Sequence, residues 1–218
     1  MNPPLDNSIG RAEMGHPFPS LKLSGAILAG GENRRMPVLK PFLDVGGECI
    51  LDRTIAVLGN LVDDLFIVTR TPSLFADFGV RCVPDSREDR GPLTGIEAAL
   101  EAAVHPRVLV AACDMPDLSV HAARRVAGSA DNDAWAVIPR VNGRLEPLFA
   151  LYDRRLLPRI GALLTEGRRA VHPLAEDAHV RVLEVSAIGT DGKDPFRNIN
   201  TPSDLVGGPV PVRGTPGR

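Results

Sequence analysis

Short apolar runs and longer amphipathic stretches alternate along most of the chain. The apolar runs predict seven buried β-strands: Ser24–Leu28, Asp64–Thr69, Val80–Pro84, Arg107–Ala111, Ala134–Pro139, Glu146–Tyr152 and Val180–Val185. The stretches between them predict four helices: Ile50–Leu61, Leu93–Val104, Ser119–Ala127 and Arg154–Thr165. Continuous apolar strands separated by helices are typical of a mostly parallel sheet with helices on both faces. We therefore predict a single-domain α/β protein whose ligands bind beyond the carboxyl ends of the strands.

Both ends of the chain lack this alternation. Residues 1–20 contain prolines and no period, and residues 207–218 are rich in Gly and Pro. We expect two flexible tails around one domain at residues 21–206. The amino-terminal segment has no cationic start followed by an apolar stretch, and no apolar run reaches the length of a membrane span. These features predict a cytoplasmic protein with no membrane partner.

Composition narrows the classes of function. The chain has 218 residues, of which 44% are hydrophobic, so one domain with a sizeable core is expected. Its net charge of -2 gives no overall basic field, which argues against a nucleic-acid partner. The 3 cysteines and 5 histidines are scattered, without the spacings of a disulfide framework or a zinc site. Any phosphate chemistry must therefore use a local group of cations.

The first predicted strand ends in a glycine turn that is followed by such cations. Gly30 and Gly31 remove side chains where the backbone must come close to another group, and Arg34, Arg35 and Lys40 follow. A strand, a glycine turn and clustered cations together predict an anion pocket, most simply for the phosphates of a nucleotide. Neither a P-loop nor a dinucleotide fingerprint is present. A tight turn with a solvated basic face is the simpler alternative.

Two further predicted strands end in carboxylates. Asp114 follows the strand Arg107–Ala111, and Asp85 follows the strand Val80–Pro84. Because the carboxyl ends of parallel strands lie at one edge of a sheet, we expect both carboxylates near the glycine turn. Asp114 is a candidate ligand of Mg²⁺, which commonly binds one or two carboxylates together with substrate phosphates. The alternative for Asp114 is a capping role in a turn or helix.

Several ordered motifs resemble one family. Leu28 to Met36 read L-A-G-G-E-N-R-R-M, and Lys40 follows four positions later. This segment is similar to the signature L-A-G-G-x-x-x-R-M-x-x-x-K of nucleotidyltransferases that activate sugars and cofactors with an NTP, and most similar to the molybdenum cofactor guanylyltransferase family. Where that family usually has Gly and Asp, this chain has Pro37 and Leu39. Other matching segments are Gly91–Gly95 (G-P-L-x-G), Cys113–Pro116 (C-D-x-P), Gly143–Leu148 (G-R-x-x-P-L) and Asn198–Pro202 (N-x-N-T-P).

The resemblance implies a Rossmann-like nucleotidyltransferase fold and a set of site residues. It implies Arg34, Lys40 and Asp114 as catalytic residues, with Asp114 as the ligand of Mg²⁺. It implies Arg144, Asn198 and Asn200 as the residues that bind the acceptor. The implied nucleotide-binding residues are Leu28, Ala29, Gly30, Gly31, Lys40, Thr69, Asp85, Gly91, Pro92, Leu93, Gly95 and Asp114.

The resemblance also implies a reaction. The terminal phosphate of molybdopterin would attack the α-phosphorus of GTP, so that GMP is transferred and pyrophosphate leaves. The implied partners are GTP and molybdopterin, with molybdoenzyme-assembly proteins as further candidates. Two alternatives stay open. The same fold could transfer a cytidylyl or other NTP-derived group to molybdopterin or to a sugar or alditol phosphate. Because of Pro37 and Leu39, the chain could also be a catalytically silent nucleotide-binding assembly protein.

Overall fold

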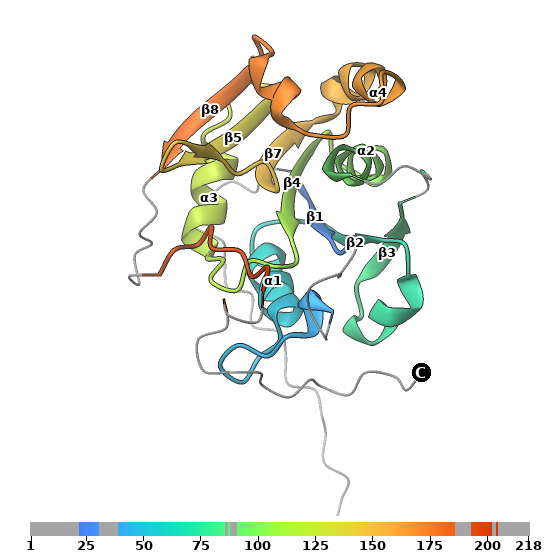
Figure 1. Cartoon of the computed structure of the whole chain (residues 1–218), viewed down its shortest axis with the longest axis vertical. Helices are drawn as coiled ribbons and strands as arrows, with labels where there is room; N and C mark the ends of the chain where they lie inside the picture. Colours follow the sequence, from blue (N-terminus) through green and yellow to red (C-terminus); the bar gives the residue numbers. More distant parts are fainter. Residues whose placement is uncertain are drawn as a thin grey trace, which may run out of the picture.

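One mixed β-sheet forms the centre of the molecule (Figure 1). The computed structural model describes residues 22–30, 39–85, 87, 91–185, 193–201 and 204. Within them, the strand order is β3-β2-β1-β4-β7-β5-β6, and β8 pairs with β5. The strands are β1 Ser24–Leu28, β2 Asp64–Thr69, β3 Arg81–Pro84, β4 Arg107–Ala112, β5 Ala136–Val141, β6 Arg144–Leu145, β7 Phe149–Asp153 and β8 Val180–Val185.

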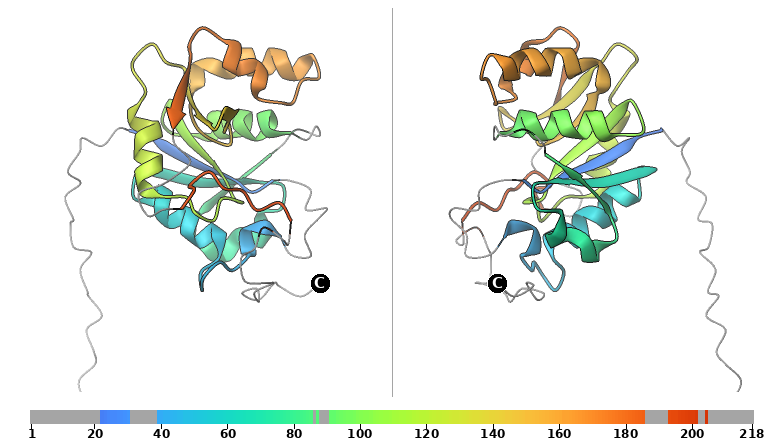
Figure 2. Two further views of the ribbon diagram at one scale, coloured as in Figure 1. Left: turned by 60° about the vertical axis from the view of Figure 1, so that its left-hand side comes forward. Right: turned by 90° about the vertical axis from the view of Figure 1, so that its right-hand side faces the viewer.

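Helices cover both faces of this sheet (Figure 2). The apolar side chains of α1 and α3 pack into the core on one face, and those of α2 and α4 pack into the core on the other. The α-helices are α1 Ile50–Gly59, α2 Pro92–Ala102, α3 Val120–Gly128 and α4 Leu157–Thr165. Short 3₁₀ helices are η1 Lys40–Phe42, η2 Pro72–Phe78, η3 Arg154–Leu156 and η4 His172–Glu176.

The predicted α/β class, with a mostly parallel sheet and helices on both faces, is confirmed. The strands β3, β2, β1 and β4 are parallel to one another, and β8 is parallel to β5. The strand β7 is antiparallel to both β4 and β5, which the apolar pattern did not reveal. The chain reverses after β5 at Asn142 and Gly143, whose φ angles of 48° and 79° suit a two-residue hairpin turn.

The structure shortens one predicted strand. The run Glu146–Tyr152 was expected to be extended throughout, but β7 begins only at Phe149. The Glu146 N–H donates to the carbonyl of Pro139, and the Phe149 N–H donates to the carbonyl of Glu146, so the intervening residues form a turn. The buried Tyr152 hydroxyl holds this turn by donating to the carbonyl of Pro147 at 2.7 Å.

Some predictions fall on residues that the structure does not describe. These are both tails, at residues 1–20 and 207–218, and the loop residues Gly31, Arg34, Arg35 and Pro37. In the described part of the chain, no helix is long and apolar enough to cross a membrane.

A partly buried carboxylate joins the amino ends of β1 and β2. Asp64 accepts hydrogen bonds from the Ser24 hydroxyl at 2.8 Å, the Val104 N–H at 3.0 Å and the Arg81 guanidinium at 2.9 Å. Burial alone would raise the pKa of Asp64, but these three donors and the Arg81 charge outweigh it and lower the pKa below its ordinary value. The ionised form therefore stabilises the fold.

Asp64→Asn should cost about 1–3 kcal/mol of unfolding free energy at pH 7, because the donors lose a charged acceptor. The pKa of Asp64 is lower in the folded state, so its contribution is present above the unfolded pKa of about 4 and is lost as the pH falls through the folded pKa. Urea unfolding of both proteins between pH 7 and pH 3 should show the difference shrinking on acidification. Asp77→Asn, at an exposed carboxylate, is the control; a difference independent of pH would contradict the assignment.

Candidate active site

In-register parallel pairing brings four strand ends to one edge of the sheet. Leu28 at the end of β1 pairs with Val68 of β2 and with Ala112 of β4. Thr69 at the end of β2 pairs with Pro84 of β3. The segments that leave these strands must therefore start side by side, as the sequence predicted.

Backbone hydrogen bonds continue beyond the strands and fix where these segments start. The Ala29 N–H donates to the carbonyl of Val68 at 2.9 Å, and the Cys113 N–H donates to the carbonyl of Leu28 at 3.3 Å. Gly30 is exposed, and a Cβ added to it would meet nothing within 4 Å. The glycine turn therefore starts, with the exposed Gly30, next to Cys113, the residue before Asp114.

Three polar side chains meet at this edge. The Lys40 ammonium donates to Asp114 Oδ2 at 3.0 Å and to Asn200 Oδ1 at 2.9 Å. Asp114 Oδ1 is buried, and none of the described residues donates a hydrogen bond to it. Lys40 comes from η1, Asp114 follows β4, and Asn200 belongs to the carboxyl-terminal segment. All three were selected from the sequence, and the structure brings them into contact.

An aromatic cluster fixes the backbone of Lys40. Phe42, two residues later, is buried, and its ring stacks on that of Phe75 with the centroids 5.5 Å apart. Leu39 also packs against this core. The family usually has Asp at this position. The apolar Leu39 has a structural explanation, because its packing against the core anchors the start of η1.

Asp85 lies at the end of β3 in a similar position to Asp114. Its Oδ2 lies 3.5 Å from the Arg70 guanidinium and accepts from the Thr94 hydroxyl at 3.3 Å. Its Oδ1 is buried and has no hydrogen-bond donor among the described residues. Nearby, Arg87 forms a two-bond contact with the buried Glu97 of α2, which fastens the segment after Asp85 to the helix. A partly satisfied carboxylate of this kind can still accept hydrogen bonds from a ligand.

The segment Gly91–Gly95 begins α2, and its glycines have different surroundings. A Cβ at Gly91 would lie 2.6 Å from the Cβ of Arg169, so the backbone at Gly91 packs closely against another part of the chain. The Leu93 N–H donates to the Arg169 carbonyl at 3.2 Å, and the Leu93 side chain is fully buried. A Cβ at Gly95 would meet Leu28 at an ordinary 3.5 Å. Packing accounts for Gly91 and Leu93, and the nucleotide contacts of Gly91, Pro92, Leu93 and Gly95 stay predictions.

Two of the three candidate acceptor residues, Arg144 and Asn198, interact with a carboxylate that the sequence analysis did not select, Glu146. Burial raises the pKa of Glu146, and the charges of Asp194 and Asp114 raise it further. The Asn198 side chain hydrogen-bonds to Glu146, and the exposed Arg144 lies close enough for its charge to oppose that rise in pKa. Arg144, Asn198 and Asp114 thus all act on the same carboxylate, that of Glu146.

The carboxyl-terminal segment is fastened directly onto the loop that holds Asp114. The Ile199 N–H donates to the carbonyl of Asp114 at 2.9 Å, and the Ile199 side chain is fully buried. The Phe196 ring packs against Phe149 of β7 with the centroids 5.6 Å apart. These contacts on either side of Asn198 fix the positions of both asparagines.

An ion pair completes this attachment. Arg197 Nε donates to Asp117 Oδ2 at 2.7 Å, and the Asp117 side chain is only 8% exposed. Arg197 Nη1 also donates to the carbonyl of Asp204, whose carboxylate accepts from the N–H groups of Asn200 and Thr201. The sequence analysis missed this pair because 80 residues separate its members and no local pattern relates them.

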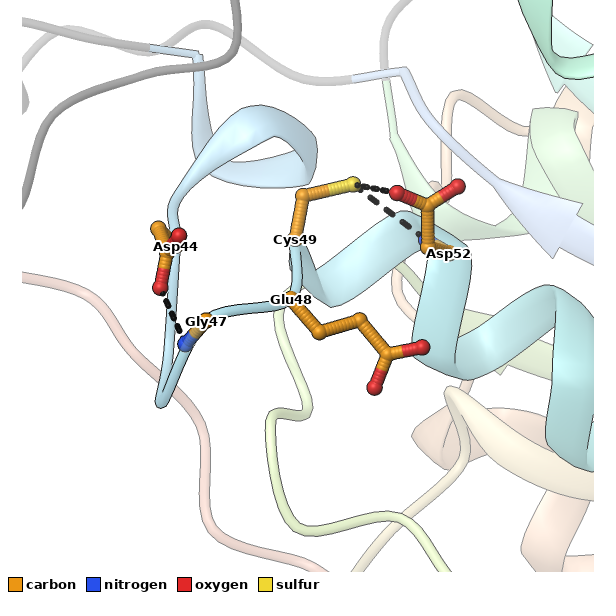
Figure 3. A pocket seen from close by; sticks show the side chains of 5 residues that line it. All are labelled: Asp44, Gly47, Glu48, Cys49 and Asp52. Atoms are coloured by element: carbon orange, nitrogen blue, oxygen red, sulfur yellow. Dashed lines mark hydrogen bonds between the residues drawn. The ribbon is translucent and has the colours of Figure 1, made fainter.

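A separate hollow beside the start of α1 is lined by acidic side chains (Figure 3). Its volume is about 520 Å³, and it is lined by Asp44, Gly47, Glu48, Cys49 and Asp52. The Cys49 sulfur accepts from the Asp52 N–H and so caps α1, while its thiol donates to the Asp52 carboxylate at 3.0 Å. Burial and Asp52 raise the pKa of Cys49 to about 11. Its carboxylates would repel phosphates, so this hollow is not a nucleotide site.

Two observations limit the chemistry available at the carboxyl edge. Burial and the Asp114 charge raise the pKa of Cys113 to about 12, so its thiol stays neutral and is a poor nucleophile. No three His, Cys, Asp or Glu side chains in the described part of the chain form a metal cage. Asp114 and Asn200 offer oxygen atoms, which fits a hard cation such as Mg²⁺ that takes few protein ligands and is completed by water or phosphate.

A largely parallel α/β sheet with a glycine turn, a lysine and two carboxylates at its carboxyl edge defines a nucleotide-binding protein of the doubly wound class. Residues 25–181 match the family described as the MobA-like NTP transferase domain. The chain belongs to this family of nucleotidyltransferases.

Named relatives agree with this assignment. The "Probable molybdenum cofactor guanylyltransferase" of Pelotomaculum thermopropionicum is 36% identical over 189 residues, which are 85% of this chain and 91% of that protein. The molybdenum cofactor guanylyltransferase of Desulfosudis oleivorans is 32% identical over 84% of this chain and 92% of its own length. The crystal structure of molybdopterin-guanine dinucleotide biosynthesis protein A from Archaeoglobus fulgidus has the same fold, with a TM-score of 0.67 and 23% identity over 84% of this chain and 94% of that one.

Arg197→Met should loosen the carboxyl-terminal segment, because it leaves the buried Asp117 carboxylate without its charged donor. Such a loss typically costs about 1.5–3 kcal/mol, which corresponds to roughly tenfold or faster exchange of the Ile199 and Asn200 amides. Hydrogen exchange followed by mass spectrometry or NMR measures this. Arg181→Met, which removes an exposed arginine from Asp131, is the matched control. Unchanged protection of Ile199 in Arg197→Met would contradict the fastening role.

Proposed function

We propose that this chain is a molybdenum cofactor guanylyltransferase, which transfers GMP from GTP to molybdopterin in a Mg²⁺-dependent reaction and releases pyrophosphate. Family membership and the names of the relatives support this function. The structural observation that supports it most directly is the contact of Lys40 with Asp114 and Asn200 at the carboxyl edge of the sheet. We also propose that the domain comprises residues 21–206 and works in the cytoplasm, where molybdoenzyme-assembly proteins would be its further partners.

The proposed chemistry is a displacement at phosphorus. An oxygen of the molybdopterin phosphate forms a bond to the α-phosphorus of GTP, and the bond from that phosphorus to the bridging oxygen of the β-phosphate breaks. Pyrophosphate leaves with the electron pair. A phosphate monoester has a second pKa near ~6, so the nucleophile is already largely ionised at neutral pH and needs no general base. Positioning and charge stabilisation provide most of the catalysis.

The residues at the carboxyl edge fit this task. Lys40 would pair with the phosphates of GTP, and Arg34 is proposed to do the same from the glycine loop. Asp114 and Asn200 would hold Mg²⁺, which when bound neutralises the phosphate charge and orients the reacting groups. The unpartnered Asp114 Oδ1 leaves that carboxylate one oxygen for such a ligand.

The acceptor would bind on the other side of Asp114. Asn198, which hydrogen-bonds to Glu146, and Arg144, whose charge acts on the same carboxylate, would offer an amide and a guanidinium for the polar groups and phosphate of molybdopterin. The nucleotide would lie over Leu28, Ala29, Gly30 and Gly31. The Thr69 hydroxyl donates to the Ala29 carbonyl at 3.5 Å and so helps to hold the start of this turn in place.

Asp114→Asn should lower kcat/KM by about 10²–10³, the typical loss when one preorganised electrostatic contact in a transition state is removed. Asparagine keeps the shape of the side chain but not its charge. Pyrophosphate release with GTP, Mg²⁺ and molybdopterin measures the effect, and circular dichroism checks the fold. Glu101→Gln, an exposed carboxylate on α2, should be unaffected. Full activity of Asp114→Asn would remove the metal assignment, and an inactive wild-type protein would favour the silent assembly protein.

Asp85→Asn should weaken the preference for GTP over CTP. The Watson–Crick edge of guanine presents two N–H donor groups that a carboxylate can accept, whereas that of cytosine presents one. We therefore expect KM for GTP to rise about tenfold or more, as for a lost charged hydrogen bond, with a smaller change in kcat. Steady-state kinetics with each nucleotide and the same acceptor measure this. A wild-type protein that prefers CTP would instead identify a cytidylyltransferase.

A further inference from the structure

One ammonium group lies between the two side chains that are best placed to hold a divalent cation. Lys40 Nζ is 3.0 Å from Asp114 Oδ2 and 2.9 Å from Asn200 Oδ1. Lys40 is 74 positions from Asp114 and 160 positions from Asn200 in the sequence, so these contacts depend on the folded structure. The side chains of Lys40 and Asp114 are only 23% and 20% exposed, so the pair is largely shielded from water.

This arrangement resembles that of an ion and its ligands. A lysine ammonium is a compact point charge with three donors, and both of its partners here are oxygen atoms. Oxygen atoms from carboxylates and amides are also the ligands that hard divalent cations take. The lysine therefore satisfies the same two oxygens that such a cation would use.

We propose that Lys40 takes the place of the divalent cation while no nucleotide is bound, and that it moves to the phosphates when GTP arrives. This inference rests on the proposed function and adds an order of events to it. A bare divalent cation must displace a positive charge from Asp114. A triphosphate brings the negative charge that draws Lys40 away, so the nucleotide and the metal bind together.

The contacts around the three residues are consistent with a movement of the lysine side chain alone. Asp114 is fixed by its backbone, since its carbonyl accepts from the Ile199 N–H. Asn200 is held by the Asp204 carboxylate through its own N–H. The backbone of Lys40 is anchored through the buried Phe42, whereas the Lys40 side chain is long and has rotatable bonds. The two oxygens therefore stay in place when the ammonium leaves them.

Mn²⁺ binding in the absence of nucleotide tests the proposal. Electron paramagnetic resonance of free Mn²⁺ gives the affinity of the full chain for the ion. Lys40→Met removes the competing charge, so it should bind Mn²⁺ about tenfold or more tightly than the wild type, within the usual range of coupling between sites. The double variant Lys40→Met with Asp114→Asn should lose this gain. Lys40→Gln provides a second, polar replacement if the methionine variant folds poorly.

Arg144→Met is the matched control for net charge. It also removes one positive charge, which acts on Glu146, but no described hydrogen bond joins Arg144 to Asp114 or Asn200. It should raise Mn²⁺ affinity less than Lys40→Met does. In thermal unfolding, Mn²⁺ should also raise the Tm of Lys40→Met by more than that of the wild type.

The outcomes separate this inference from the proposed function. Equal Mn²⁺ affinity in the wild type and both Lys40 variants, with loss in Asp114→Asn, would overturn the role of Lys40 and leave the metal assignment intact. An equal gain in Arg144→Met would also overturn it, since the effect would then be one of general charge. A gain that survives Asp114→Asn would place the cation elsewhere and overturn both.

Discussion

The parallel pairing of β1 with β2 on one side and β4 on the other is the constraint on which the rest of the site depends. Leu28 is in register with both Val68 and Ala112, so the chain leaves all three strands at the same edge. Parallel strands require long crossovers, and the helices in these crossovers bury both faces of the sheet. Asp85 and Asp114, which follow two of these strands, therefore lie at one edge of the sheet, and the sheet behind them is packed mostly with apolar side chains.

The carboxyl-terminal segment turns this edge into a site. It has no regular secondary structure at residues 193–200, yet its side chains and amides are tied both to the loop after β4 and to β7. Ile199 binds the Asp114 carbonyl, Arg197 binds Asp117, and Phe196 packs on β7. A segment held by so many separate contacts can present Asn198 and Asn200 in fixed positions without belonging to the sheet.

The charge of the protein differs between the hollow beside α1 and the carboxyl edge of the sheet. The chain as a whole is slightly acidic, and the acidic hollow beside α1 is kept in shape by Arg53, which donates to the carbonyls of Val45 and Pro116. Among the described residues at the carboxyl edge, Lys40 contacts Asp114 and the Arg70 guanidinium lies beside Asp85, so positive charge here comes from particular side chains and not from a general field.

The sequence by itself determined most of the strands and helices along the chain and the candidate residues Lys40, Asp114 and Asn200. These follow from local periods and short motifs. Tertiary structure alone decided that β7 runs antiparallel and that Arg169 packs so closely on Gly91 that a side chain would not fit there. It also decided that Asn198 hydrogen-bonds to Glu146 and that Arg197 pairs with Asp117. It also decided that one ammonium would join Asp114 to Asn200. The physical reason is that these contacts join residues far apart in the chain, and their geometry is set by how helices and strands pack, which no local pattern encodes.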